Sequence, residues 1–165
     1  MKNGKKDKEI PGSFSKEIWF LGVCKLLNQV KAKYLVLGGW ACNLHGLVRA
    51  TKDIDLLIPK DIQNTELVLQ ALENLTFGIA KELDAEEVTR KPFTIIGDTP
   101  RVDLLTVAGK INYPKAARTS LKIKIDEVEI PYVDLETLLK TKQTDRLQDK
   151  ADIERLKQIR KMKKE

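Results

Sequence analysis

Apolar and polar positions along the chain follow two periods, one typical of strands and the other of helices. Short apolar runs between glycine, proline or charged residues predict buried strands, and strict alternation predicts a half-buried strand. These patterns predict strands over 34–38, 54–58, 93–96, 102–106, 121–125 and 128–130. The third and fourth of these segments flank a turn that contains Gly97 and Pro100, so we expect them to pair as a hairpin.

Other segments carry apolar residues three or four positions apart, which is the spacing of one helix face. They predict helices over 15–29, 40–46, 61–75, 134–142 and 147–160. Ser15 and Asp134 are expected N-caps, because their side-chain oxygens can accept hydrogen bonds from free backbone N–H groups. The expected apolar stripes are Ile18, Leu21, Cys24 and Leu27 in the first helix, and Ile62, Leu67 (or Glu66), Leu69, Leu72 and Leu75 in the third.

Length and composition suit a single α/β domain. The chain has 165 residues, 42% hydrophobic and 5% aromatic, which is enough to bury one sizeable core. We expect that domain at residues 13–160, preceded by a disordered basic tail at 1–12 and followed by a short basic tail at 161–165.

The net charge of +6 lies at the two ends of the chain. Residues 1–12 carry +2 and residues 155–165 carry +5, which leaves −1 for the long central part. Basic ends can contact the phosphates of RNA or DNA. They are more often simply solvated, and we favour that interpretation because the central part is close to neutral.

Location and redox environment follow from what the sequence lacks. No apolar run approaches the length of a membrane span, and the first residues lack the apolar region of a secretory signal. Cys24 and Cys42 form no metal-binding spacing, and Cys24 lies on an apolar stripe that predicts a core position. We therefore expect a cytoplasmic protein with no membrane contact.

The strongest chemical signal lies between residues 34 and 59. One apolar run ends in Gly38-Gly39, and a second contains Asp53 and Asp55. Alternate side chains of a strand share a face, so the two carboxylates are expected on the same side, roughly 7 Å apart along the chain. Carboxylate pairs hold hard cations such as Mg²⁺, and a glycine turn lets backbone N–H groups approach a phosphate.

A third carboxylate, Asp103, lies between apolar residues of another predicted strand. It can align beside Asp53 and Asp55 on a neighbouring strand, or it can be an edge-strand charge that faces water. Three clustered carboxylates raise one another's pKa unless a cation lies among them. Such clusters bind two metal ions in enzymes that transfer phosphoryl groups.

Gly38-Gly39, Asp53-x-Asp55 and Asp103 together resemble the nucleotidyltransferase superfamily that includes DNA polymerase beta. The string GGWACNLHGLVRATKDIDLLI is most similar to its minimal members: small antibiotic nucleotidyltransferases and the nucleotidyltransferase toxins of abortive-infection and toxin–antitoxin systems. Segments 133–142 and 146–153 are similar to the closing helices of that group. Many members have serine at the position of Gly39, although a Gly-Gly form also occurs.

The resemblance implies a fold and a reaction. The fold is α/β (α+β), a nucleotidyltransferase-like mixed sheet flanked by helices, with further helices at the C-terminus. The reaction moves a nucleoside monophosphate from an NTP to a hydroxyl or phosphate acceptor and releases pyrophosphate. Asp53, Asp55 and Asp103 are the implied catalytic and metal-binding residues, for two Mg²⁺ ions or Mn²⁺ in their place.

Nucleotide binding is expected at residues around this site. Gly38, Gly39, Arg49 and Thr51 are candidates for a phosphate cradle, and the resemblance adds two charged residues, Lys142 and Asp149. Arg49 can pair with a triphosphate or with the carboxylates, or it can be a surface arginine, and Thr51 can simply begin the strand. From the residues alone we favour Lys142 and Asp149 as ordinary helix-surface charges.

Two further residues near the motif are given structural roles. Trp40 is expected to pack under the glycine turn, with nucleobase stacking as the alternative. His45 precedes a glycine at a predicted helix end, where it is expected to act as a charge partner of the helix C-terminus.

The sequence leaves the acceptor open among a small hydroxyl compound such as an antibiotic, a tRNA 3′ end and a protein side chain. A homodimer partner or another protein could complete the acceptor pocket. Two other functions remain as alternatives: a non-catalytic or protein-modifying partner of a toxin–antitoxin pair, and a DxD glycosyltransferase, which normally needs a longer nucleotide-binding domain.

Overall fold

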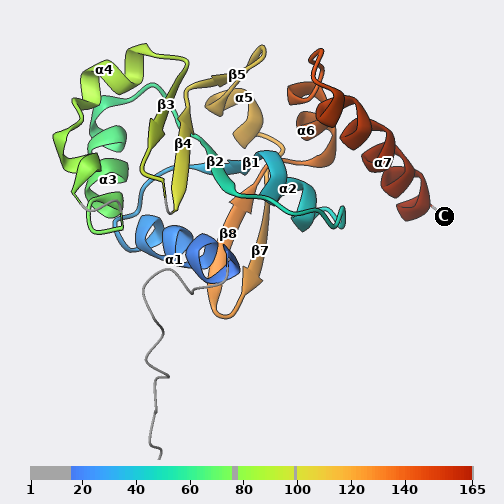
Figure 1. The fold of residues 1–165 in the computed structure, drawn as a ribbon, viewed down its shortest axis with the longest axis horizontal. Coiled ribbons are helices and arrows are strands. Elements are labelled where there is room, and N and C mark those ends of the chain that lie inside the picture. Colours follow the sequence, from blue (N-terminus) through green and yellow to red (C-terminus); the bar gives the residue numbers. More distant parts are fainter. Residues whose placement is uncertain (1–15, 76–77, 99, 165) are drawn as a thin grey trace, which may run out of the picture.

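The computed structural model describes residues 16–75, 78–98 and 100–164, and these residues form a six-stranded mixed sheet flanked by helices (Figure 1). The strand order is β3-β4-β2-β1-β8-β7; β2 is parallel to β4 and antiparallel to β1. The expected fold class is therefore confirmed. The strands are β1 (Leu35–Leu37), β2 (Asp53–Leu57), β3 (Phe93–Ile96), β4 (Arg101–Leu105), β7 (Leu121–Ile125) and β8 (Val128–Tyr132).

Helices gather at the two ends of the molecule, with the sheet between them (Figure 1). In Figure 1, α3 and α4 lie beside β3 and β4, whereas α6 and α7 lie at the opposite side of the molecule. The helices are α1 (Lys16–Gln29), α2 (Gly38–Leu44), α3 (Ile62–Leu72), α4 (Ala85–Arg90), α5 (Tyr113–Ala117), α6 (Leu135–Thr141) and α7 (Leu147–Lys163). No helix in the described part of the chain has the length and apolar composition to cross a membrane.

The central strands β2 and β4 separate an apolar face from a polar one. On β2, Ile54 and Leu56 point to the face that packs into the core, and both are buried. Asp53 and Asp55 alternate with them and point to the other face. The apolar half of the pattern fixes the register, because a slip by one residue would bury both carboxylates.

The first residue of two expected helix faces is wrong, whereas Cys24, Leu27, Leu69 and Leu72 of those faces are buried as expected. Ile18 and Ile62 were expected in the core, but they are 47% and 45% exposed. The buried face of α1 is instead centred on Phe20, Val23, Cys24 and Leu27, which lie against α3 and β8. Ile62 lies in the first turn of α3, before the buried face begins. The expected N-cap Ser15 lies outside the described residues.

Element boundaries differ from the expectation at three helices. Helix α2 begins at Gly38, so the glycine pair forms its first turn rather than a separate loop. Helix α3 ends at Leu72, before the expected 75, and α7 continues to Lys163, beyond the expected 160. The N-caps of α3 and α6 are Asp61 and Asp134, whose side chains accept hydrogen bonds from the backbone N–H groups of Asn64 and Thr137.

Short elements were not predicted, because one or two turns carry too little periodicity to be recognised. They are α4, α5, the 3₁₀ helix η1 (Ile79–Glu82) and the hairpin of β5 (Val107–Ala108) with β6 (Ile111–Asn112).

The residues that surround the glycine turn are packed into the core. The Trp40 ring stacks on Phe20, with centroids 4.3 Å apart, so Trp40 packs under the turn as expected. Cys24 is buried, also as expected. His45 is the C-cap of α2, but it is buried and its Nε2 hydrogen bonds to the backbone oxygen of Val133. Burial lowers the pKa of His45, which disfavours the charged form that the expected role requires.

Candidate active site

The three predicted carboxylates lie on two adjacent parallel strands. Asp55 on β2 is the register partner of Asp103 on β4. Asp53 lies two residues before Asp55 and therefore points to the same face of the sheet. The partner of Asp53 on β4 is Arg101. The side chains of Asp53 and Asp103 are 39% and 16% exposed, so this part of the sheet is reached by solvent.

Arg101 lies among these carboxylates and was not among the predicted site residues. Its Nε and Nη2 donate hydrogen bonds to the two carboxylate oxygens of Asp103, at 2.9 and 3.1 Å. Its Nε lies 3.8 Å from Asp53 Oδ2. The sequence contained a signal for this pairing, because Arg101 and Asp103 are two residues apart on one strand and therefore share a face.

One guanidinium does not neutralise three carboxylates. Burial raises the pKa of Asp55 to about 6, and the negative charges of Asp103 and Asp53 contribute to this rise. Lys142 has the opposite, smaller effect on that pKa, which means that its ammonium group lies close enough to act on the cluster. The site is therefore built to hold excess negative charge next to positively charged groups.

Gly38 allows the chain to turn directly against this cluster. Its φ is +63°, in the left-handed region that glycine adopts without strain. A Cβ added to Gly38 would overlap the carboxylate oxygen Oδ2 of Asp55, and one added to Gly39 would overlap Oγ1 of Thr51. The two glycines thus let the backbone of the turn lie close to Asp55 and Thr51.

We expect Gly38→Ala to reduce nucleotidyl transfer by more than about tenfold and to destabilise the protein. A left-handed alanine costs about 1–2 kcal/mol, and the methyl group must also displace Asp55. Activity and thermal unfolding are the measurements. Gly22→Ala in α1 is the matched control, because a methyl group at Gly22 would meet nothing within 4 Å; it should keep full activity. Equal activity in both variants would show that the approach to Asp55 is not needed.

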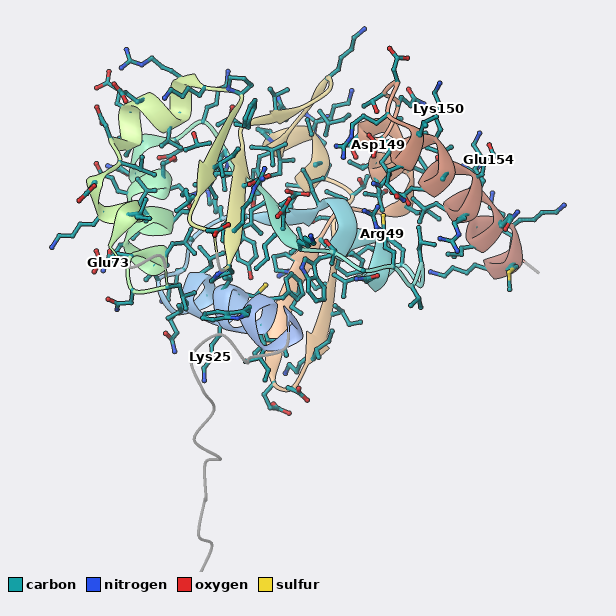
Figure 2. The ribbon with its side chains drawn as sticks, viewed as in Figure 1. Lys25, Arg49, Glu73, Asp149, Lys150 and Glu154 are labelled. Carbon is teal, nitrogen blue, oxygen red and sulfur yellow. The ribbon has the colours of Figure 1, made fainter. Side chains whose placement is uncertain are left out.

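A second charged cluster joins the loop before β2 to the C-terminal helices. Arg49 pairs with Asp152 of α7, and Lys142 Nζ lies 2.9 Å from Asp152 Oδ2 and 3.5 Å from Asp149 Oδ1. Thr144 Oγ1 donates to Asp149 Oδ2 at 2.6 Å. Figure 2 shows Arg49 and Asp149 on the side of the molecule formed by α7.

This buried cluster corrects the alternative that Lys142 and Asp149 are helix-surface charges. Lys142, Asp149 and Asp152 are all buried, and Asp152 is fully so. Burial lowers the pKa of Lys142, but Cys42, Asp152 and Asp149 outweigh this effect and the pKa is raised. Asp152 was missed by sequence reasoning, although its spacing to Asp149 and Leu156 places all three on one buried face of α7.

The predicted nucleotide-binding residues therefore lie in two connected groups. Gly38, Gly39 and Thr51 adjoin the carboxylates, whereas Arg49 and Asp149 belong to the buried cluster with Asp152. Lys142 links the groups, since it contacts Asp152 and acts electrostatically on Asp55. Arg49 contacts Asp152 and makes no ion pair with Asp53, Asp55 or Asp103 among the described residues.

The carboxylate oxygens of Asp53, Asp55 and Asp103 (the carboxylate row) are suitable ligands for a divalent cation. In this structure, however, Arg101 occupies both carboxylate oxygens of Asp103. No three His, Cys, Asp or Glu side chains within residues 16–75, 78–98 and 100–164 are grouped as a ready metal site. Oxygen ligands from carboxylates are nevertheless what Mg²⁺ prefers. Burial, and to a lesser extent the charges of Asp103 and Asp53, raise the pKa of Asp55, and a bound cation would favour its charged form.

The mixed sheet flanked by helices has the fold of a nucleotidyltransferase. A family model described as aminoglycoside-2''-adenylyltransferase matches residues 20–156. The chain belongs to this family.

A solved structure has a similar fold. It is the crystal structure of LnuA, a lincosamide antibiotic adenylyltransferase, bound to lincomycin. The similarity covers 88% of this chain and 98% of that chain, with a TM-score of 0.57 and 19% sequence identity. No match was found among the curated proteins.

Proposed function

We propose that this chain transfers AMP from ATP to a hydroxyl group of a small antibiotic-like molecule. Membership of an adenylyltransferase family supports the nucleotide, and the family description together with the lincomycin-bound structural relative supports the acceptor. The observation that carries the proposal is the pairing of Asp55 with Asp103 next to Gly38.

The reaction requires one bond to form and one to break. The acceptor oxygen attacks the α-phosphorus of ATP, the bond to the oxygen that bridges the α- and β-phosphorus breaks, and pyrophosphate leaves with the electron pair. Asp103 accepts the proton of the acceptor hydroxyl. It is a suitable acceptor because it is partly exposed and lies at the edge of the row, where a substrate can reach it.

Asp53, Asp55 and Asp103 would hold the metal, for which we propose Mg²⁺. When bound, the ion supplies positive charge that stabilises the transferring phosphoryl group and the leaving pyrophosphate. Asp103 would have to release its bidentate contact with Arg101 before it could bind the ion. Arg101 is then free to contact a phosphate, for which its planar donors are suited.

The remaining residues bind the triphosphate in this proposal. The first backbone N–H groups of a helix have no partner within it, so those at Gly38 and Gly39 are available to phosphate oxygens. Thr51 lies beside Gly39, and Lys142 and Arg49 supply positive charge from the buried cluster. Asp149 acts through Lys142, which it holds by an ion pair.

The test is to incubate the protein with labelled ATP, Mg²⁺ and lincomycin or kanamycin, and separately with total RNA or a cell lysate. We expect label in the antibiotic fraction, and strongly reduced label with Asp103→Asn. Label that enters only protein would favour a protein-modifying toxin–antitoxin partner and contradict the proposal.

The basic ends provide a second test of the acceptor. We expect removal of residues 1–12 and 161–165 to leave transfer to an antibiotic unchanged, because the proposed site lies outside both segments. If the acceptor were RNA, each lost phosphate contact would flatten the log–log salt dependence of binding by about one unit. Labelling by full-length and trimmed protein at two salt concentrations distinguishes these outcomes.

A further inference from the structure

We propose that Phe93 and Ile95, which are exposed on the edge strand β3, form an apolar shelf that binds the non-reacting part of the acceptor. The proposal rests on the nucleotidyl transfer proposed above and names the class of acceptor: a hydroxyl compound with an apolar face beside the reacting group. It assigns acceptor specificity to a strand that carries none of the predicted site residues.

The register of the sheet places the shelf next to the carboxylate row. Ile95 on β3 pairs with Asp103 on β4, which pairs in turn with Asp55 on β2. Directly opposed residues of neighbouring strands point to the same face, with Cβ atoms about 5 Å apart. Ile95 therefore lies one strand away from the carboxylate that receives the acceptor proton.

A second apolar row continues the same surface. Phe93 pairs with Leu105, which is partly buried, and Leu105 pairs with the buried Leu57. The apolar surface thus begins in the core at β2 and reaches solvent at β3. Phe93 is 57% exposed and Ile95 49%, whereas Ile96, on the other face of β3, is buried.

The exposed side chains lie on the reactive face, and this position argues for a substrate. Water-facing positions of a half-buried edge strand normally carry polar or charged residues. Here Ile95, which is opposite Asp103, and Phe93, which is opposite Leu105, are both large and apolar. An acceptor whose hydroxyl reaches the α-phosphorus near Asp103 can cover them with its remaining atoms, and burial of this surface contributes binding free energy.

The chemistry of the shelf distinguishes two kinds of acceptor. Lincomycin combines sugar hydroxyls with a hydrocarbon arm, so its apolar part can cover the shelf while a hydroxyl reacts. Kanamycin is a polycation with little apolar surface and gains little from Phe93 or Ile95. We therefore expect the wild-type protein to have the higher kcat/KM for lincomycin.

The test uses Phe93→Ala and Ile95→Ala with both antibiotics. We expect each variant to raise the KM for lincomycin about tenfold, since an exposed apolar side chain loses its contact with the bound acceptor. The KM for ATP and the KM for kanamycin should change by less than about twofold. Phe93→Leu should restore most of the lincomycin affinity, because it keeps an apolar side chain of similar reach.

Ile79→Ala is the matched control. Ile79 is 48% exposed but lies on η1, which packs against α3 rather than beside the carboxylates. It should leave every kinetic constant unchanged. Thermal unfolding of all variants identifies any loss of folded protein, and an equilibrium titration of lincomycin without ATP measures acceptor binding independently of turnover.

Four results would overturn the shelf. Transfer by the wild-type protein with an unchanged lincomycin KM in both shelf variants would remove it and leave the proposed function intact. A higher wild-type kcat/KM for kanamycin would reject the acceptor class. Dissociation of a dimer by Phe93→Ala, at unchanged acceptor KM, would assign the surface to a second copy of the chain. Transfer to neither antibiotic would reject the proposed function together with the shelf.

Discussion

Asp55→Asn is expected to reduce nucleotidyl transfer by at least about 1,000-fold, equivalent to about 4 kcal/mol of transition-state stabilisation. Asp55 lies in the middle of the carboxylate row, between Asp53 on its own strand and Asp103 on the next. Asparagine keeps its shape but loses the charge that holds a cation. Asp53→Ala is expected to have the same effect, and turnover at saturating ATP is the measurement.

The Asp55→Asn variant should also be more stable than the wild-type protein when no metal is added. The pKa of Asp55 is raised from 3.8 to about 6 in the folded protein, so its ionisation opposes folding. That cost is absent below pH 4, grows as the pH rises towards 6, and reaches about 3 kcal/mol above it. Asp55→Asn removes the cost, and denaturant unfolding at pH 4 and pH 7.5 measures the difference.

Asp126→Asn is the control for both measurements. Asp126 is exposed in the turn between β7 and β8, and its φ of +47° is one that asparagine also adopts readily. It should change neither activity nor stability. An active Asp55→Asn protein would exclude the carboxylate row as the catalytic site.

Asp152→Ala is expected to lower the free energy of unfolding by about 3 kcal/mol, because it leaves the partners of a buried ion pair without compensation. Asp152 is fully buried and binds three groups at once: Arg49, Lys142 and the side-chain amide of Gln148. This loss is a large fraction of the stability of a typical domain. The KM for ATP should also rise, because two cations proposed to bind the triphosphate lose their common anchor.

Glu154→Ala tests whether the effect is specific to the buried position. Glu154 lies on the same helix but is exposed, as Figure 2 shows. It should change the free energy of unfolding by less than about 0.5 kcal/mol. Denaturant unfolding compares the two variants, and similar values for both would mean that the cluster contributes little.

The sequence was sufficient to locate the carboxylates but not to arrange them. Asp53, Asp55 and Asp103 stand out because each interrupts an apolar strand. Asp103 pairs with Asp55 because β4 lies next to β2 in the sheet. This strand order is set by long-range packing and cannot be predicted from the local sequence pattern. The hairpin of β3 and β4 was predictable, because a glycine–proline turn joins two short apolar runs.

The errors have local physical causes. Ile18 and Ile62 were assigned to the core from spacing alone, yet both lie near helix starts, where the buried face has not begun. Asp152 was missed because a charged residue on a helix is normally solvated. Its burial becomes understandable only when Arg49, which is distant in the sequence, is brought beside it.

The pairing of Arg49 with Asp152 joins positions that are 103 residues apart. During synthesis on the ribosome, Arg49 emerges long before Asp152 of α7. Until α7 docks, Arg49 and Lys142 have no shared anion to hold them in place. The nascent chain can therefore complete the proposed phosphate-binding cluster only after α7 has emerged, so a product that ends before Asp152 is expected to be inactive.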